Sequence, residues 1–308
     1  MLEQSTNQKI DSFLQKSPSA LKKLQEMATQ TKEFPSTQLL IYKLMRLTND
    51  VTTFDTELIN YLSEDAELAS LIIQKAKIGV RLSGIKISQS QLKQSIKRLG
   101  YGFVYNQVQN KFAKEYVRVY YDTDNQQVKT LIKKSLRLAY VAKGIAKMIN
   151  YDNEAQCFCA GINYYVGEMI LGLRDRIAHN EIVKMQQQGF DKKAAELSVL
   201  GFDTGELAAR KLEEWLLPDH IVNVVRNHDN PVNVKDHNYK IAILMKFAEF
   251  VNDALLNKQS GPHAMWDKAY DYLAKLDSRM TIDQWSDKIR LIYIQLLETE
   301  HALYQRKV

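Results

Sequence analysis

Histidine is the residue type in this sequence best suited to metal chemistry. One histidine forms an adjacent pair, His228-Asp229, and an imidazole beside a carboxylate can bind a divalent cation when other helices supply further ligands. Asp175 and His179 would share a helix face, but two side chains do not complete a site. No His-Glu-x-x-His motif is present. The six histidines are His179, His220, His228, His237, His263 and His301.

Nucleophilic chemistry has less support in the sequence. The two cysteines, Cys157 and Cys159, are one residue apart, so on a helix they would face different ways, and two thiols alone rarely hold zinc. The chain has no Gly-x-Ser-x-Gly motif and no phosphate-binding glycine loop. We therefore expect both cysteines to be buried thiols of a reducing, cytoplasmic protein.

Residues 100–104, Gly-Tyr-Gly-Phe-Val, are similar to part of an RNA-binding strand whose aromatic side chains stack on bases. Leu99 stands where that pattern has a basic residue, and Asn106 stands where it has an aromatic one. Helical patterns flank the segment on both sides. The segment is therefore interpreted as a glycine that ends a helix, followed by aromatic residues of the core.

The elements that must position these residues are predicted to be helices. Apolar residues recur at spacings of three and four through 58–76, 136–149 and 207–216. Three helix starts have the spacing of a capping box, in which the first side chain accepts from a free backbone N–H and the residue three positions on reaches back. These pairs are Ser88 with Gln91, Asp203 with Glu206, and Thr281 with Gln284.

Composition excludes several classes of protein. In 308 residues, 45% are hydrophobic and 25% are charged, values typical of a chain with a packed core rather than a disordered one. The 12 glycines and 5 prolines are too few for a sandwich or barrel whose turns recur every ~8–12 residues. No stretch approaches the ~18 uninterrupted apolar residues of a membrane span. Residues 1–17 lack an apolar leader, so we expect no secretory signal. We also expect no membrane partner.

The net charge of +6 conceals an uneven distribution. Residues 73–147 hold sixteen Lys or Arg against three acidic residues, a net of +13, and the remainder has a net of −7. These cations either keep helix faces solvated or form a basic face for an acidic protein or a nucleic acid. The candidates for such a face are Lys93, Lys97, Arg98, Lys111, Lys114 and Arg118.

A series of short motifs follows one another between residues 20 and 232. The most specific is Leu200-Gly201-Phe202-Asp203-Thr204-Gly205-Glu206-Leu207, followed by Glu214-Trp215-Leu216-Leu217-Pro218. Residues 161–167 read Gly-Ile-Asn-Tyr-Tyr-Val-Gly. The other motifs are Phe34-Pro35, Glu64-Asp65-Ala66-Glu67-Leu68, Ile87-Ser88, Ser95-Ile96, Leu99-Gly100, Lys134-Ser135-Leu136, Val141-Ala142 and the stretch from Ile221 to His228-Asp229. In order and spacing, the series resembles the HDOD family, the HD-related output domain of bacterial signalling proteins.

The resemblance implies an all-α fold. We expect an HDOD-like domain over residues 20–232, in which an N-terminal helical bundle (20–125) packs on an HD-like bundle (128–232). Residues 233–308 are expected to form a C-terminal helical extension.

Catalytic HD phosphohydrolases hold one or two metal ions with His and Asp side chains, and this chain departs from that pattern. Tyr164-Tyr165 stands in place of the His-Asp pair, Thr204 in place of a later His, and Lys134 near the position of the first His. A tyrosine of ordinary pKa is a poor ligand, and an ammonium has no lone pair to offer. We therefore expect no catalytic residue, no bound metal and no cofactor. The resemblance instead predicts a degenerate pocket formed by Lys134, Tyr164, Tyr165, Thr204, His228, Asp229 and Glu249.

The resemblance, together with the replaced ligand positions, implies a non-catalytic regulatory or scaffolding module in bacterial signal transduction that acts through protein–protein contacts. Its expected partner is another signalling protein with an acidic surface. Two alternatives stay open at this point. One is a metal-dependent phosphohydrolase with an altered site, and the other is a nucleic-acid-binding module that uses residues 73–147.

Overall fold

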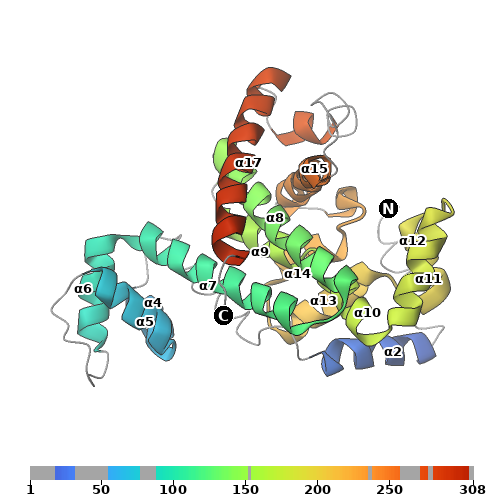
Figure 1. Ribbon diagram of the computed structural model, residues 1–308, viewed down its shortest axis with the longest axis horizontal. Helices are drawn as coiled ribbons and strands as arrows, with labels where there is room; N and C mark the ends of the chain where they lie inside the picture. Colours follow the sequence, from blue (N-terminus) through green and yellow to red (C-terminus); the bar gives the residue numbers. More distant parts are fainter. Residues whose placement is uncertain are drawn as a thin grey trace. The chain divides into compact units, whose positions relative to one another are not determined.

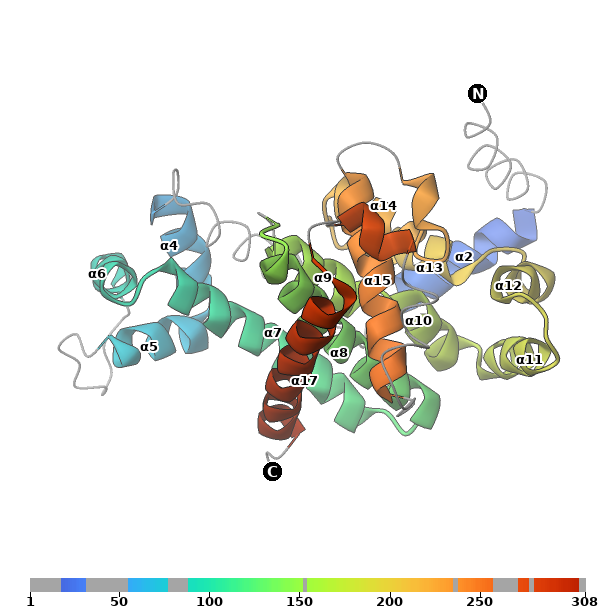
Figure 2. The same ribbon diagram turned by 90° about the horizontal axis from the view of Figure 1, so that it is seen from above.

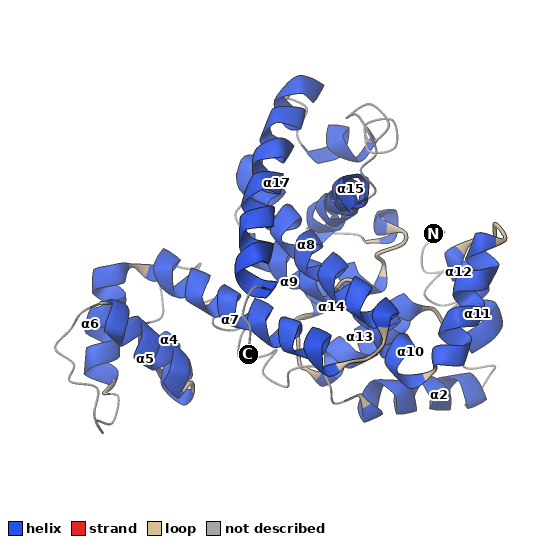
Figure 3. Ribbon diagram, in the orientation of Figure 1, coloured by secondary structure: helices blue, strands red, loops and turns tan. Residues whose placement is uncertain are grey.

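The computed structural model describes residues 18–31, 55–76, 88–151, 154–234, 238–256, 271–276 and 280–304 (Figure 1). All regular structure within these ranges is helical (Figure 3), which confirms the predicted all-α fold. None of the helices described is both long enough and apolar enough to cross a membrane. His237 and His263 lie outside the described residues.

Contacts divide the chain into two compact units, one formed by residues 35–118 and the other by residues 1–34 and 119–308. Residues 20–31 were assigned from the sequence to the N-terminal bundle. The structure instead packs α2 (Pro18–Gln30) against helices α10 and α13 of the larger unit. The domain boundaries inferred from the sequence remain predictions.

The smaller unit contains helices α4 (Asp55–Glu64), α5 (Ala66–Lys75), α6 (Gln89–Leu99) and most of α7 (Tyr101–Asp122). At the start of α6, the Gln91 N–H donates to Ser88 Oγ at 3.2 Å and the Ser88 N–H donates to Gln91 Oε1 at 3.3 Å, as the capping-box spacing predicts. Gly100 ends α6 with a φ of 80°, a conformation that glycine adopts without strain. Residues 101–104 then form the first turn of α7, so the segment similar to an RNA-binding strand is helical.

Helix α8 (Gln126–Met148) runs through the middle of the larger unit in both views (Figures 1 and 2). It packs against α9 (Glu154–Asn163), α10 (Val166–Arg174), α15 (Tyr239–Leu256) and α17 (Ile282–Tyr304). The remaining elements of this unit, besides α2, are α11 (Arg176–Gln187), α12 (Lys192–Leu200), α13 (Thr204–Glu214), α14 (Asp219–Arg226) and the short η1 (Pro231–Asn233).

The helix starts predicted at Asp203 and Thr281 are also present. Asp203 Oδ1 accepts from the Glu206 N–H at 2.8 Å and so caps α13. The Glu206 carboxylate does not reach back to complete a box, because it binds Arg226 and Arg210 instead. Asp203 thus fixes the start of α13 beside α10, where the candidate site lies.

Candidate functional site

Three acidic side chains and a histidine surround the ammonium of Lys192, the first residue of α12. Its Nζ lies 2.5 Å from Glu168 Oε1 and 3.1 Å from His228 Nε2. It lies 3.7 Å from Asp229 Oδ1 and 4.0 Å from Glu196 Oε1. We call these five residues the lysine centre: Lys192, Glu168, Glu196, His228 and Asp229.

Three separate segments bring the lysine centre together: α12 carries Lys192 and Glu196, α10 carries Glu168, and the stretch after α14 carries His228 and Asp229. Asp191 caps α12 by accepting from the Ala194 N–H at 3.0 Å. This cap fixes the first turn of the helix, which carries Lys192. Glu168 comes from the first turn of α10. The other two acceptors, His228 and Asp229, follow α14, which ends at Arg226. The helix does not resume there, since Asn230 precedes a proline and is disfavoured in helical conformation.

The hydrogen bonds of His228 fix its tautomer. Its Nδ1 lies 3.0 Å from the Val225 carbonyl, so Nδ1 carries the proton and donates. Burial lowers the pKa of His228, which favours the neutral ring. Its Nε2 therefore accepts a hydrogen bond from Lys192. His228 and Asp229 are consequently two acceptors around one ammonium rather than an ion pair of their own.

Two opposing effects set the charges at the lysine centre: burial disfavours the charged forms, and attraction between opposite charges favours them. Burial opposes the charged form of Lys192, but Glu168, Asp229 and Glu196 outweigh it and raise the pKa of the ammonium. Burial likewise disfavours ionised Glu168, and Lys192 reverses the effect so that the pKa of Glu168 falls below its ordinary value. Lys192 and Glu168 are therefore a charged pair. Burial raises the pKa of Glu196 to about 7, although Lys192 opposes this.

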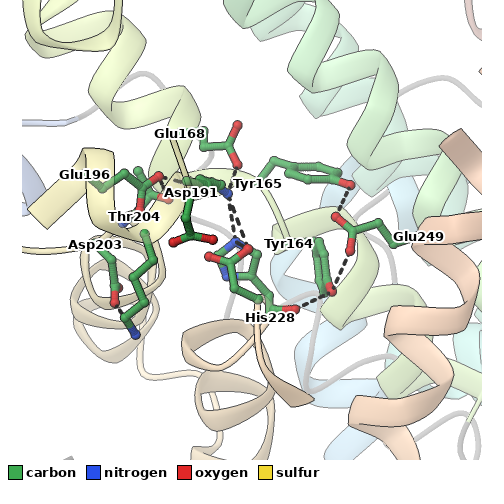
Figure 4. Close-up of polar contacts among 12 residues, drawn as sticks. Tyr164, Tyr165, Glu168, Asp191, Glu196, Asp203, Thr204, His228 and Glu249 are labelled. Carbon is green, nitrogen blue, oxygen red and sulfur yellow. Dashed lines mark hydrogen bonds and ion pairs between the residues drawn. The ribbon is translucent and has the colours of Figure 1, made fainter. Parts of the chain in front are cut away.

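Tyr164 and Tyr165, between α9 and α10, contact a carboxylate outside the lysine centre, that of Glu249 on α15 (Figure 4). The Tyr165 hydroxyl donates to Glu249 Oε1 at 2.9 Å. The Tyr164 hydroxyl lies 3.1 Å from the His228 carbonyl and 3.4 Å from Glu249 Oε2. Burial raises the pKa of both phenols well above the ordinary value, so both stay protonated. Their rings, exposed by 1% and 3%, fill this part of the interior.

The two remaining predicted pocket residues, Lys134 and Thr204, each contact one member of these two groups. Lys134 on α8 lies 4.5 Å from the centre of the Tyr165 ring and 3.0 Å from Asp253 Oδ1. Thr204 at the start of α13 donates from Oγ1 and from its backbone N–H to Glu196, at 2.7 and 2.9 Å. The structure therefore joins Tyr164, Tyr165, His228 and Glu249 directly, and reaches Thr204 only through the lysine centre.

Sequence reasoning missed Lys192, Glu168 and Glu196. Glu168 directly follows the 161–167 motif, which was the one available signal. Lys192 offered none, because a lysine just after an N-cap reads as a solvated residue of the first helical turn. It lies 36 positions from His228, so no local pattern relates the two.

The lysine centre does not fit a metal ion. An ammonium already lies among the carboxylates, it would repel a second cation, and the neighbouring tyrosines are protonated. Within the described ranges, no three His, Cys, Asp or Glu side chains are grouped so that they could hold one metal. Burial also raises the pKa values of Cys157 and Cys159 well above the ordinary value, which leaves both as unreactive thiols.

The basic-face candidates all lie in the smaller unit. Lys93, Lys97 and Arg98 are exposed on α6, and Lys114 and Arg118 are exposed on α7. Lys111 differs from these, since its Nζ lies 2.7 Å from Asp65 Oδ2 and 3.2 Å from Glu67 Oε2. Lys111 therefore holds α7 to the start of α5, and its charge is largely neutralised.

Solved structures with the same fold come from several bacteria. A candidate phosphohydrolase from Shewanella amazonensis SB2B has a TM-score of 0.64 and 17% identity over 92% of this chain and 98% of its own. An HDOD domain protein of unknown function from Geobacter sulfurreducens has a TM-score of 0.63 and 16% identity, with the same coverage of 92% and 98%. A candidate signal transduction protein from Marinobacter aquaeolei VT8 has a TM-score of 0.50 and 16% identity over 85% of this chain and 58% of its own.

None of the curated proteins matches the chain. The family comparison is more specific than the structural likenesses, which at these identities show the fold alone. The model that describes the HDOD domain matches residues 34–231, well over half of the chain. The match includes the 161–167 and 200–207 motifs and the residues of the lysine centre. The chain therefore belongs to the HDOD domain family.

Proposed function

We propose that this chain is a non-catalytic regulatory module of signal transduction that acts through protein–protein contacts. The observation that carries the proposal is the lysine centre, where an ammonium occupies the space between Glu168, His228 and Asp229. A metal at such a position would activate water by lowering its pKa to about 7. The ammonium instead donates hydrogen bonds to these side chains and gives the bundle a fixed, charge-balanced interior.

Family membership and one structural neighbour agree with a signalling role. HDOD domains are output domains of signalling proteins, and the Marinobacter aquaeolei neighbour is described as a candidate signal transduction protein. The Shewanella amazonensis neighbour, described as a candidate phosphohydrolase, supports the enzymatic alternative. We favour the regulatory role, because Lys192 of this chain satisfies the acceptors that a hydrolytic metal would need.

The partner we propose is a signalling protein with an acidic surface, and its docking site is the exposed basic residues of the smaller unit. Lys93 and Lys97 are one helical turn apart on α6, as are Lys114 and Arg118 on α7, so each pair shares a helix face. A protein surface complementary in charge would be steered toward these faces. Nucleic acid is less favoured, since Tyr101 and Phe103, the residues of the supposed base-stacking strand, are half-buried in the first turn of α7.

Reversing four charges of the basic face is expected to abolish capture of this partner. The variant carries Lys97→Glu, Arg98→Glu, Lys114→Glu and Arg118→Glu, and its control carries Lys22→Glu and Lys184→Glu at exposed sites of the larger unit. Each protein is crosslinked in the native cell, and the captured protein is identified, purified and titrated. We expect affinity for it to fall at least tenfold in the variant only, about 1.4 kcal/mol.

Two results would count against this docking site. One is capture that is equal in the variant and the control. The other is tight binding of a short DNA duplex at ~150 mM salt, with log K falling by about 0.9 per contacted phosphate as log[salt] rises. That second result would establish the nucleic-acid alternative.

A further inference from the structure

The outward face of α17 bears an apolar stripe. The opposite face of this helix is buried, with Trp285, Ile289, Ile292 and Leu296 each exposed by 8% or less. Arg137 on α8 also holds α17 through two hydrogen bonds to Glu300, which fixes how the helix is rotated. Helix α17 packs on α8, which Figure 2 shows behind it. The outward face is therefore a defined surface of the larger unit.

Three apolar side chains project from that face. Leu291 is 61% exposed, Ile294 is 47% exposed and Leu297 is 42% exposed. At 100° per residue, Leu291 and Leu297 lie about 60° to either side of Ile294, and the buried row lies on the far side of the helix. Single exposed apolar residues are ordinary, but three in one stripe mark an interaction surface.

Around the stripe, residues at equal distances before and after Ile294 are complementary in charge. Arg290 lies four residues before Ile294, and Glu298 lies four residues after it; both are exposed. Asp287 and His301 stand seven residues before and after it, and both are also exposed. Asp287 and Glu298 thus each have a histidine or a basic residue at the same distance on the other side of Ile294.

A second copy of this chain is the surface that this pattern fits. If two α17 helices pack antiparallel about a two-fold axis at Ile294, Leu291 of each copy lies level with Leu297 of the other. Arg290 of each copy then lies level with Glu298 of the other, about 6 Å from the axis along the helix. We infer that this chain forms a homodimer through the outward face of α17, an isologous contact in which one patch binds itself.

The contact is small, which sets its strength. From Asp287 to His301 the helix spans about 21 Å, and three apolar side chains supply its centre. Stable dimers bury about 800 Å² on each partner, more than this stripe alone provides. The dimer is therefore weak, with a dissociation constant on the order of 100 µM. The inference is independent of the proposed signalling role and does not involve the basic face.

Charge reversal across the two-fold axis tests the dimer directly. Arg290→Glu places two glutamates at one level, and Glu298→Arg places two arginines there. We expect each single variant to weaken dimerisation at least tenfold in sedimentation equilibrium, and the double variant to restore it. Three results would each overturn the inference: a monomeric wild-type chain at 500 µM, single variants that dimerise as the wild type does, or a double variant no better than the singles.

A disulfide at the two-fold axis gives a second readout. Helix axes about 8–10 Å apart, each with a Cα radius of about 2.3 Å, leave facing Cα atoms about 3–5 Å apart, a range whose upper part allows a disulfide. Ile294→Cys should therefore give a covalent dimer under mild oxidation, since Cys157 and Cys159 are buried. The control is Ile177→Cys on α11, a site that is 82% exposed. Equal crosslinking of both variants would show random collision and contradict the α17 contact.

Discussion

Replacing Lys192 with methionine is expected to lower the free energy of unfolding by about 2–3 kcal/mol. The substitution keeps an unbranched side chain that is one heavy atom shorter, but leaves Glu168, Asp229 and the acceptor nitrogen of His228 without their shared donor. Removing one partner of a fully buried ion pair costs about 3–5 kcal/mol. A smaller loss is expected here because about a fifth of each side chain of the Lys192–Glu168 pair remains exposed, 23% and 20%.

The neighbouring lysine supplies a matched control. Lys193 lies 2.8 Å from Asp203 but is 40% exposed, so Lys193→Met should cost less than about 1 kcal/mol. The double variant Lys192→Met, Glu168→Gln removes both charges of the pair and should recover part of the loss. Urea unfolding measures all three. A loss for Lys192→Met no larger than that for Lys193→Met would show that the lysine centre is not an internal charge cluster.

Replacing Gly167 with alanine is expected to cost at least about 3 kcal/mol. A Cβ at this position of α10 would lie 1.9 Å from the Thr204 carbonyl oxygen, a backbone atom at the start of α13. Adding a methyl group to a packed interior usually costs about 1–3 kcal/mol. The upper end or more applies here, because a backbone atom yields only if α13 moves. That movement would also disturb the bonds between Thr204 and Glu196.

The control is Gly102→Ala in the first turn of α7, where an added Cβ meets nothing within 4 Å. Alanine favours a helix over glycine by about 1 kcal/mol, so this variant should match the wild type or exceed it in stability. Urea unfolding compares the two. If Gly167→Ala proves as stable as Gly102→Ala, the close approach of α10 and α13 is absent from the protein.

Local features of this fold were predictable from the sequence, since local chemistry determines them. The cap at Ser88 depends on two residues three positions apart, and the cap at Asp203 depends on the Asp203 side chain and a backbone N–H three positions on. The helices follow from apolar spacing in the same way. The placement of α2 was not predictable. Its buried residues, such as Leu24, form an ordinary apolar helix face, and the sequence does not say which of the two bundles that face packs against.

The candidate site was predictable only in part, for the same reason. Tyr164 and Tyr165 stand within a recognisable motif, and their replacement of metal ligands can be read residue by residue. The residue-by-residue comparison does not reveal that the ammonium of Lys192 lies among the remaining acceptors. Lys192 reaches Glu168 across 24 positions and His228 across 36, so only the tertiary fold brings the three together.

The metal content of the full chain tests the central claim most directly. The protein is purified without added metal, incubated with Mn²⁺, Fe²⁺ or Zn²⁺ in separate samples, dialysed and subjected to elemental analysis. Because Lys192 occupies the space between the acceptors, the account predicts far less than one metal ion per chain in every sample. Near-stoichiometric metal that is lost in the variants His228→Ala and Glu168→Ala would contradict it, and would favour a phosphohydrolase with an altered site.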